Sequence, residues 1–224
     1  MAIKERLVDL KISVDDEDAH FSLTDQTPLR DDAFDISDDK KIAIIQKHFA
    51  AIMETLGLDL TDDSLSDTPL RVAKMFVKEN FSGLNPSNKP LVKLFKNKYK
   101  YDEMLIEKNI HVSSTCEHHF LPITGTAAVA YIPNGSVVGL SKLNRVVNYF
   151  AKRPQVQERM TRQIGQELIK ALGTEDVAVV INAAHLCVSS RGINDKNSLT
   201  ITSFYSGKFK DSKMKKEFLH HIQL

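Results

Sequence analysis

The chain has 224 residues, of which 42% are hydrophobic and 26% are charged. This is ordinary globular composition, and the length allows one domain with a sizeable core and an appendage. The 30 Lys and Arg residues nearly balance the 29 Asp and Glu residues, which leaves a formal net charge of +1. Such a balance gives no general attraction to nucleic acid or to a membrane surface, so neither is expected as a partner.

Targeting signals and cysteine usage predict a cytoplasmic protein. No apolar run approaches the roughly 20 residues that a membrane helix needs. The first 20 residues lack the apolar core of a secretory signal. The only cysteines, Cys116 and Cys187, are far apart in the sequence. In a reducing compartment such a pair favours metal binding or catalysis over a disulfide.

The N-terminal part of the chain divides into an arm and a helical region. Residues 1–36 carry clustered acidic residues and little periodicity, which predicts a loosely ordered arm. Residues 37–100 are predicted to form an N-terminal helical region. Apolar residues at helical spacing predict helices over 38–56 and 68–83, the second with Thr68 as its N-cap, directly before a proline.

Residues 101–224 are predicted to form the main domain of the chain. Two strands, two helices, two further strands and a final helix are expected in chain order at 104–114, 126–132, 141–152, 154–172, 177–188, 199–204 and from about 212. The strands come in adjacent pairs, which favours antiparallel pairing and an α+β class over βαβ units.

Two short segments carry the residue types of a metal site. Residues 116–119 (Cys-Glu-His-His) follow the first strand, and residues 185–187 (His-Leu-Cys) lie near the end of the third. Because side chains alternate along a strand, His185 and Cys187 are expected on one face. Thiolate and imidazole are ligands that zinc prefers, and two cysteines with three nearby histidines favour three protein ligands plus an open catalytic position. A remaining His and Glu117 are then available for acid–base work.

Each of these residues is also compatible with a role in packing, at the surface or in a structural metal site. The two cysteines can serve as small buried hydrophobic residues, with the adjacent histidines facing solvent. A metal held there can also be purely structural, although such sites usually have four protein ligands. His220 and His221 lie on the predicted C-terminal helix without a cysteine or acid cluster nearby, and they are expected at the surface.

Basic and acidic residues at predicted helix starts suggest a site for an anionic ligand. Lys142 and Arg145 share one face at a helix N-terminus, which suits an anion, although a solvated basic face is equally compatible. Glu158 lies near the start of the next predicted helix. Its carboxylate can accept two hydrogen bonds from a guanine-like edge or merely complement the helix dipole. Arg191 follows the second metal segment and can reach a phosphate.

Six motifs, taken together and in this order, resemble the GTP cyclohydrolase I family. They are DTPLRVA at 67–73, STCEHH at 114–119, VAYIP at 129–133, GLSKLNR at 139–145, RPQVQER at 153–159 and HLCVSSRG at 185–192. The resemblance covers the chain from about residue 40 to the C-terminus. It implies the tunnelling fold, with a ββ-αα-ββ unit whose helices lie on one face of an antiparallel sheet. It also implies a homodecamer of two stacked pentamers with sites at subunit boundaries.

The resemblance further implies an activity and a cofactor. GTP and water would give 7,8-dihydroneopterin triphosphate and formate, the first step of a pteridine and tetrahydrofolate pathway or of queuosine synthesis. The cofactor would be Zn²⁺, held by Cys116, His119 and Cys187.

Roles for the remaining site residues also follow from the resemblance. His185 would protonate a ring nitrogen, His118 would assist ring opening and formate release, and Ser141 would assist the sugar steps. Gln157 and Glu158 would read the guanine edge, which would reject adenine because its donors are misplaced. The triphosphate would be held by Lys142, Arg145 and Arg191, with Arg71 and Lys74 reaching in from a neighbour.

One departure from the family pattern and two competing functions complete the prediction. Thr126 stands where the family usually has Lys, so one cation near the triphosphate is expected to be missing. A nitrile reductase of the same fold uses a nucleophilic Cys without zinc, and the paired Cys and His ligands disfavour it. The intact ligand set also disfavours a non-catalytic decamer that only binds a nucleotide or a regulator.

Overall fold

The computed structural model describes residues 26–223. Most of the arm predicted over residues 1–36 therefore lies outside the described residues. The helices are α1 (Asp38–Thr55), α2 (Thr68–Met75), α3 (Leu140–Ala151), α4 (Gln157–Leu172), the short α5 (Leu186–Ser189) and α6 (Ser212–Ile222). The strands are β1 (Leu94–Lys96), β2 (Leu105–Cys116), β3 (Pro122–Tyr131), β4 (Ser136–Val138), β5 (Pro154–Gln155), β6 (Val177–His185) and β7 (Thr200–Tyr205).

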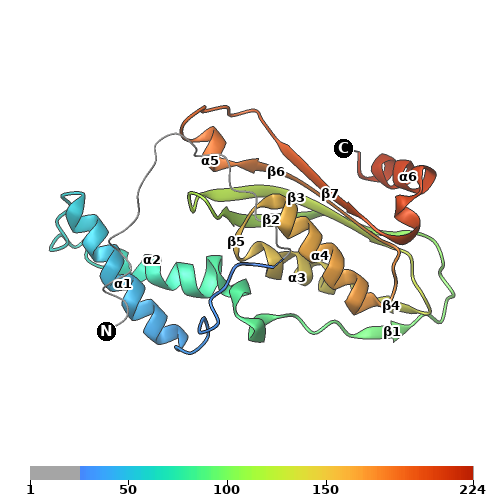
Figure 1. Cartoon of the computed structure of the whole chain (residues 1–224), viewed down its shortest axis with the longest axis horizontal. Coiled ribbons are helices and arrows are strands. Elements are labelled where there is room, and N and C mark those ends of the chain that lie inside the picture. Colours follow the sequence, from blue (N-terminus) through green and yellow to red (C-terminus); the bar gives the residue numbers. More distant parts are fainter. Residues whose placement is uncertain (1–25, 224) are drawn as a thin grey trace.

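A five-stranded sheet in the order β5-β2-β3-β6-β7 forms the centre of the fold. Its pairs are antiparallel, except that the short β5 runs parallel to β2. Strands β1 and β4 form a separate antiparallel pair. Figure 1 shows α3 and α4 packed along the sheet, with α6 apart from them at the C-terminal end of the chain. The α+β class and the ββ-αα-ββ order are confirmed.

The sheet buries side chains on both faces. Ala127 and Val129 of β3 belong to the main core, which includes buried residues of α3 and α4. The alternate residues Ala128 and Ala130 belong to a smaller core with Phe218 of α6. Because successive side chains of a strand point to opposite faces, α6 covers the face that α3 and α4 leave open. The final helix is therefore an addition to the predicted one-sided arrangement.

Several predicted boundaries shift because tertiary contacts outweigh local propensity. Helix α4 begins at Gln157 rather than 154, since Pro154–Gln155 pair with the end of β2 as β5. The helix predicted over 68–83 is α-helical only as far as Met75 and continues as a π-helix over Phe76–Asn80. Thr68 is the first helical residue instead of the N-cap.

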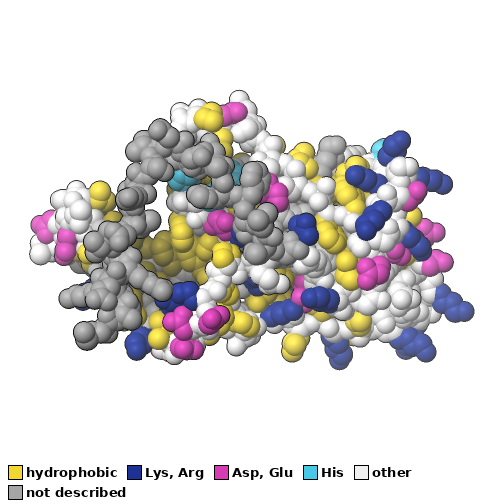
Figure 2. Space-filling model, viewed as in Figure 1, with side chains coloured by type: hydrophobic (Ala, Val, Ile, Leu, Met, Phe, Trp, Pro, Cys, Tyr) yellow, Lys and Arg dark blue, Asp and Glu magenta, His cyan; other side chains and the backbone are white. Residues whose placement is uncertain are grey.

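Helix α1 keeps much of its apolar stripe uncovered in a single chain. Ile42 and Met53 are buried, but Ile52 is 53% exposed and Leu56 beyond the helix end is 73% exposed. Figure 2 shows hydrophobic side chains gathered in a hollow between α1 and the sheet. Within residues 26–223, no helix is long and apolar enough to span a membrane.

Candidate metal centre and active site

The metal-ligand candidates meet at one end of the central strands, where β2 ends and β3 begins. Strand β2 ends at Cys116, a loop of residues 117–121 follows, and β3 returns antiparallel. Strand β6 pairs with β3 so that His185 lies opposite Ile123, at the same end of the strands. As a result, the Cys116 and Cys187 thiols and a ring nitrogen of His119 all lie within 4.8 Å of one another.

The local geometry at Cys187 differs from the strand that the sequence predicted. Strand β6 ends at His185, and Cys187 lies in the helical turn α5. The prediction that His185 and Cys187 share a strand face is therefore wrong in its premise, because the turn rather than strand alternation carries the thiol to the cluster. Cys116 is buried, Cys187 is half-buried and His119 is exposed.

This donor set fits a zinc ion. Two thiolates and one imidazole match its preferred ligands, and a tetrahedral ion would keep one position for water or substrate. Burial, and then the neighbouring Cys116 thiol, raise the pKa of the Cys187 thiol to about 11, while Arg191 opposes this shift. Two adjacent thiols resist ionisation together, and a divalent cation between them removes that penalty.

Other side chains line the metal cluster. Nδ1 of His118 lies 3.8 Å from Sγ of Cys116. Nη1 of Arg191 donates to Nε2 of His119 at 2.7 Å. Arg191 is exposed, so it also faces the solvent from which an anionic substrate would approach. The structure thus gathers both histidines of the loop and Arg191 around the two cysteines.

His185 is oriented by Gln157 from the first turn of α4. Nε2 of Gln157 contacts the carbonyl oxygens of Ile181 and Thr200 at 3.2 and 2.9 Å and the Thr202 hydroxyl at 3.1 Å. These carbonyls fix the amide orientation, so its Oε1 accepts from Nε2 of His185 at 2.8 Å. Gln157 is 1% exposed. Its amide therefore has inward partners, in contrast to the guanine-reading role predicted for it.

Glu158 stands beside His185 and is free of this buried network. It is exposed in the first turn of α4. Burial lowers the pKa of His185, and the negative charge of Glu158 partly opposes that shift. A neutral imidazole next to an exposed carboxylate can exchange a proton with one group while the carboxylate accepts hydrogen bonds from another.

Three predicted site residues lie far from the metal cluster within one chain. Ser141, Lys142 and Arg145 occupy the start of α3, where Asn144 donates to the carboxylate of Glu107 at 3.2 Å. Glu107 lies nine residues before Cys116 in β2, or about 30 Å at the usual rise per strand residue. A single chain therefore does not bring these residues to its own metal cluster.

The two basic residues predicted to reach in from a neighbour are at the surface. Arg71 and Lys74 are both exposed on α2, and Arg71 pairs with Asp67 at 3.5 Å. Thr126 is also exposed. It alternates with Ala127, so it points to the face opposite the main core, whereas His185 points toward α4. Within one chain, Thr126 is thus separated from His185 by the sheet.

Glu117 is not available for acid–base work, in contrast to the sequence-based prediction. Its carboxylate accepts two hydrogen bonds from the guanidinium of Arg159 on α4. No role was predicted from the sequence for Arg159, nor for Phe120, whose ring packs edge-to-face on Phe81. Arg159 occurs in one of the six family motifs, but nothing in its local pattern marks it as buried.

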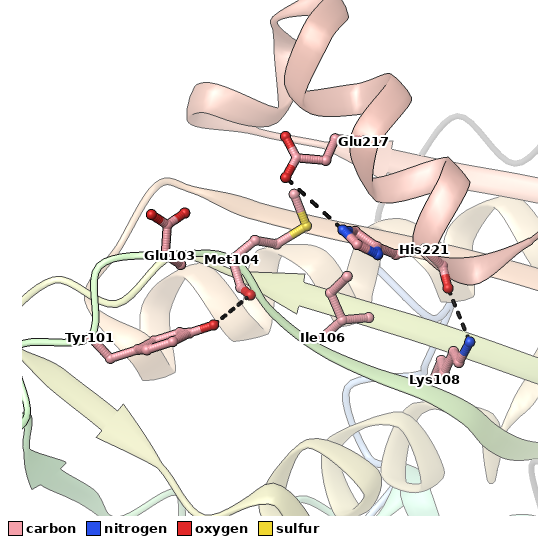
Figure 3. A pocket seen from close by; sticks show the side chains of 7 residues that line it. All are labelled: Tyr101, Glu103, Met104, Ile106, Lys108, Glu217 and His221. Atoms are coloured by element: carbon pink, nitrogen blue, oxygen red, sulfur yellow. Dashed lines mark hydrogen bonds and ion pairs between the residues drawn. The ribbon is translucent and has the colours of Figure 1, made fainter.

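A cavity of about 480 Å³ lies away from the metal cluster, between the start of β2 and α6 (Figure 3). Lys108 there donates to the carbonyl of His221 at 3.0 Å, and His221 lies 4.0 Å from Glu217. His220 and His221 are exposed, as predicted. Lys108 and Glu217 thus have partners in the cavity wall, and the lining residues include no cysteine.

The fold and the cluster define a class. This is an α+β scaffold in which two thiols and one imidazole are positioned to hold a single metal ion, beside a half-buried histidine. More specifically, the chain belongs to the GTP cyclohydrolase I family, which matches residues 45–223. The resemblance and the enzyme class inferred from the six motifs are thereby confirmed.

Individual relatives agree over most of their length. A protein of Flavobacterium johnsoniae named GTP cyclohydrolase 1 is 64% identical over 207 residues, covering 92% of this chain and 93% of the relative. Proteins of the same name from Aeromonas salmonicida and Yersinia enterocolitica are 55% and 52% identical, covering 83% and 88% of this chain and 84% and 90% of their own.

Proposed function

We propose that this chain converts GTP and water to 7,8-dihydroneopterin triphosphate and formate, with Zn²⁺ held by Cys116, His119 and Cys187. The observation that carries the proposal is the approach of these three donors to within 4.8 Å, in a chain of the GTP cyclohydrolase I family. When bound, zinc supplies a Lewis acid that makes water nucleophilic near neutral pH. The electrophile is C8 of the guanine ring.

His185 is the proton carrier in this proposal. Its Nε2 proton is engaged by Gln157, so the lone pair of the neutral ring is on Nδ1. That atom accepts a proton as water adds to C8 and returns it to the ring nitrogen whose bond breaks. His118, beside Cys116, assists opening of the ring and departure of formate. After formate leaves, the sugar opens and rearranges and its carbons close the new six-membered ring.

Glu158 is the base-reading residue. An exposed carboxylate beside His185 can accept from N1–H and the exocyclic amine of guanine at once, and this fixes the orientation of the base in the site. Adenine offers no such pair of adjacent donors, so it is rejected by an unpaired carboxylate. Gln157 contributes indirectly, through the orientation of His185.

We further propose that the working unit is an oligomer, a decamer of two pentamers. The start of α3 lies about 30 Å from its own metal cluster, so Ser141, Lys142 and Arg145 serve the site of a neighbouring subunit. There they would hold the triphosphate together with Arg191, supplemented by the exposed Arg71 and Lys74. The uncovered apolar side chains of α1 supply contact area between subunits.

The compartment and the pathway follow from the same chemistry. Cys116 and Cys187 bind a metal only as thiolates, which the reducing cytoplasm preserves. The product carries a new pterin ring, and we place this reaction at the start of a pteridine and tetrahydrofolate or queuosine pathway.

The proposal is tested by metal removal and return. Purified protein is dialysed against a chelator, and GTP turnover is followed by formate release and pterin fluorescence. We expect activity to disappear with zinc and to return after one equivalent per subunit is added. Full activity in metal-free protein would overturn the metal assignment, and absence of formate with a zinc-loaded oligomer would overturn the reaction. Sedimentation of the active species tests the oligomer, since an active monomer contradicts shared sites.

A further inference from the structure

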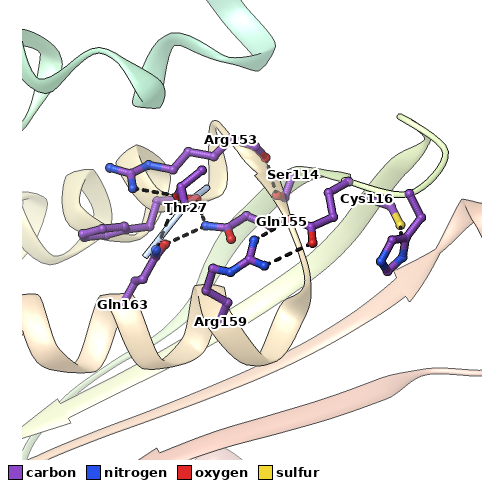
Figure 4. A network of polar contacts seen from close by, with 10 residues as sticks. Thr27, Ser114, Cys116, Arg153, Gln155, Arg159 and Gln163 are labelled. Atoms are coloured by element: carbon purple, nitrogen blue, oxygen red, sulfur yellow. Dashed lines mark hydrogen bonds and ion pairs between the residues drawn. The ribbon is translucent and has the colours of Figure 1, made fainter. Parts of the chain in front are cut away.

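A buried ion pair joins the loop of the metal cluster to α4. The Arg159 side chain is 2% exposed, and that of Glu117, the first residue of the loop 117–121, is 20% exposed. Nη1 and Nη2 of Arg159 donate to the two carboxylate oxygens at 2.5 and 3.1 Å. Figure 4 shows Arg159 reaching from α4 toward the strand end that carries Cys116.

The same loop is held at two further points. The backbone N–H of Glu117 donates to the carbonyl of Gln155 at 3.1 Å, so residues 155–159 hold both the backbone and the side chain of Glu117. At the far side of the loop, the Phe120 ring lies 5.4 Å from Phe81. Phe120 has a φ of 54°, a left-handed conformation that a bulky residue adopts only when its surroundings hold it there.

The ion pair is poorly suited to a purely stabilising role. Removing two charges from water offsets much of their mutual attraction, and well-packed apolar residues often stabilise a core equally well. In addition, Nε of Arg159 is buried and has no hydrogen-bond partner among residues 26–223. What the planar, bidentate pair supplies is a fixed geometry, because it sets both the position and the orientation of the Glu117 carboxylate.

We propose that Arg159 is a positioning residue for the metal site. Through Glu117 it fixes the loop so that Cys116 and His119 meet Cys187 at metal-binding distance. This inference rests on the zinc site of the proposed function. Together with Gln157, which holds His185, it makes the first turn of α4 the common support of the metal ligands and the proton carrier.

Two variants test this role with zinc binding as the main measurement. Arg159→Lys keeps the charge but loses the bidentate fork. The double variant Glu117→Gln/Arg159→Met leaves no charge buried, so the melting temperature of the metal-free protein should stay close to that of the wild type. We expect zinc affinity, measured by competition with a chromogenic chelator, to fall about 10- to 100-fold in both. In steady-state assays kcat should fall, with the KM for GTP little changed.

The control is Glu167→Gln, which breaks the 2.7 Å ion pair with Lys89. Glu167 lies eight residues after Arg159 on α4, about 12 Å along the helix. Its zinc affinity should equal that of the wild type. Zinc affinity within about twofold of the wild type in either folded test variant, well below the loss expected of a supporting residue, would overturn the positioning role. Failure of the wild type itself to bind zinc would instead overturn the proposed function, so the two failures are distinguishable.

Discussion

Replacement of Gln157 by Leu is the most informative single change at the proposed site. Leucine occupies a similar volume but lacks both ends of the amide. The change therefore removes the acceptor of the His185 N–H and the donor to the carbonyl oxygens of Ile181 and Thr200. Because Gln157 is 1% exposed, water cannot easily replace these contacts.

The size of the effect follows from the contacts removed. Each buried hydrogen bond contributes about 1 kcal/mol, and an unpaired buried polar group costs about 1–3 kcal/mol. We therefore expect the free energy of unfolding to fall by about 2–4 kcal/mol. An acid–base side chain accelerates a reaction about 10²- to 10⁴-fold. Since His185 stays in place but loses its fixed tautomer and orientation, kcat should fall by part of this range, roughly 10- to 100-fold.

The assay separates two roles of Gln157. GTP turnover is measured by pterin fluorescence at several GTP concentrations, and unfolding is followed in urea. A loss in kcat with unchanged KM supports orientation of His185. A rise in KM with unchanged kcat would refute this reasoning and restore the base-reading role. The matched control is Gln163→Leu on the same helix, a buried amide that donates to Thr27 and accepts from Gln155. It should lose stability without losing kcat.

Three further changes probe the ligands, the base contact and the second core. Cys187→Ser should abolish zinc binding and activity while leaving the protein folded, and wild-type zinc content in that variant would contradict the ligand assignment. Glu158→Ala should lower kcat/KM for GTP at least 100-fold, because the proposed role loses two charge-assisted hydrogen bonds to guanine of about 1.5–3 kcal/mol each, and an unchanged value would remove Glu158 from base recognition. Phe218→Ala empties a fully buried site on α6 and should lower the unfolding free energy by about 3–5 kcal/mol, with zinc content by metal analysis unaltered.

The sequence predicted the elements of the fold well where a periodic pattern reflected burial. Helix α4 and strand β6 lie close to their expected ranges because their core faces are marked by regular apolar residues. The strand Pro154–Gln155 was not predicted, because two residues show no periodic pattern and the strand forms only by pairing with Thr115 and Cys116. The end of α2 was also not predicted, because the apolar pattern that suits an α-helix also suits the π-helix that follows it.

The site was predicted at the level of residue types rather than contacts. Cys116 and Cys187 were recognisable because thiols are rare in this chain and lie beside histidines. The role of Glu117 was wrong, because its partner Arg159 is 42 residues away in the sequence. No spacing rule links two residues on different elements, and a buried arginine looks in sequence like an exposed one.

The distance between the start of α3 and its own metal cluster also affects how defects combine. If each site takes its metal ligands from one subunit and its phosphate-binding residues from another, two inactive variants repair each other when mixed. A subunit lacking Cys187 and one lacking Arg145 would together form some sites with neither defect. The activity of each site then depends on two subunits, so a defective subunit also lowers the activity of sites whose other residues come from an intact neighbour.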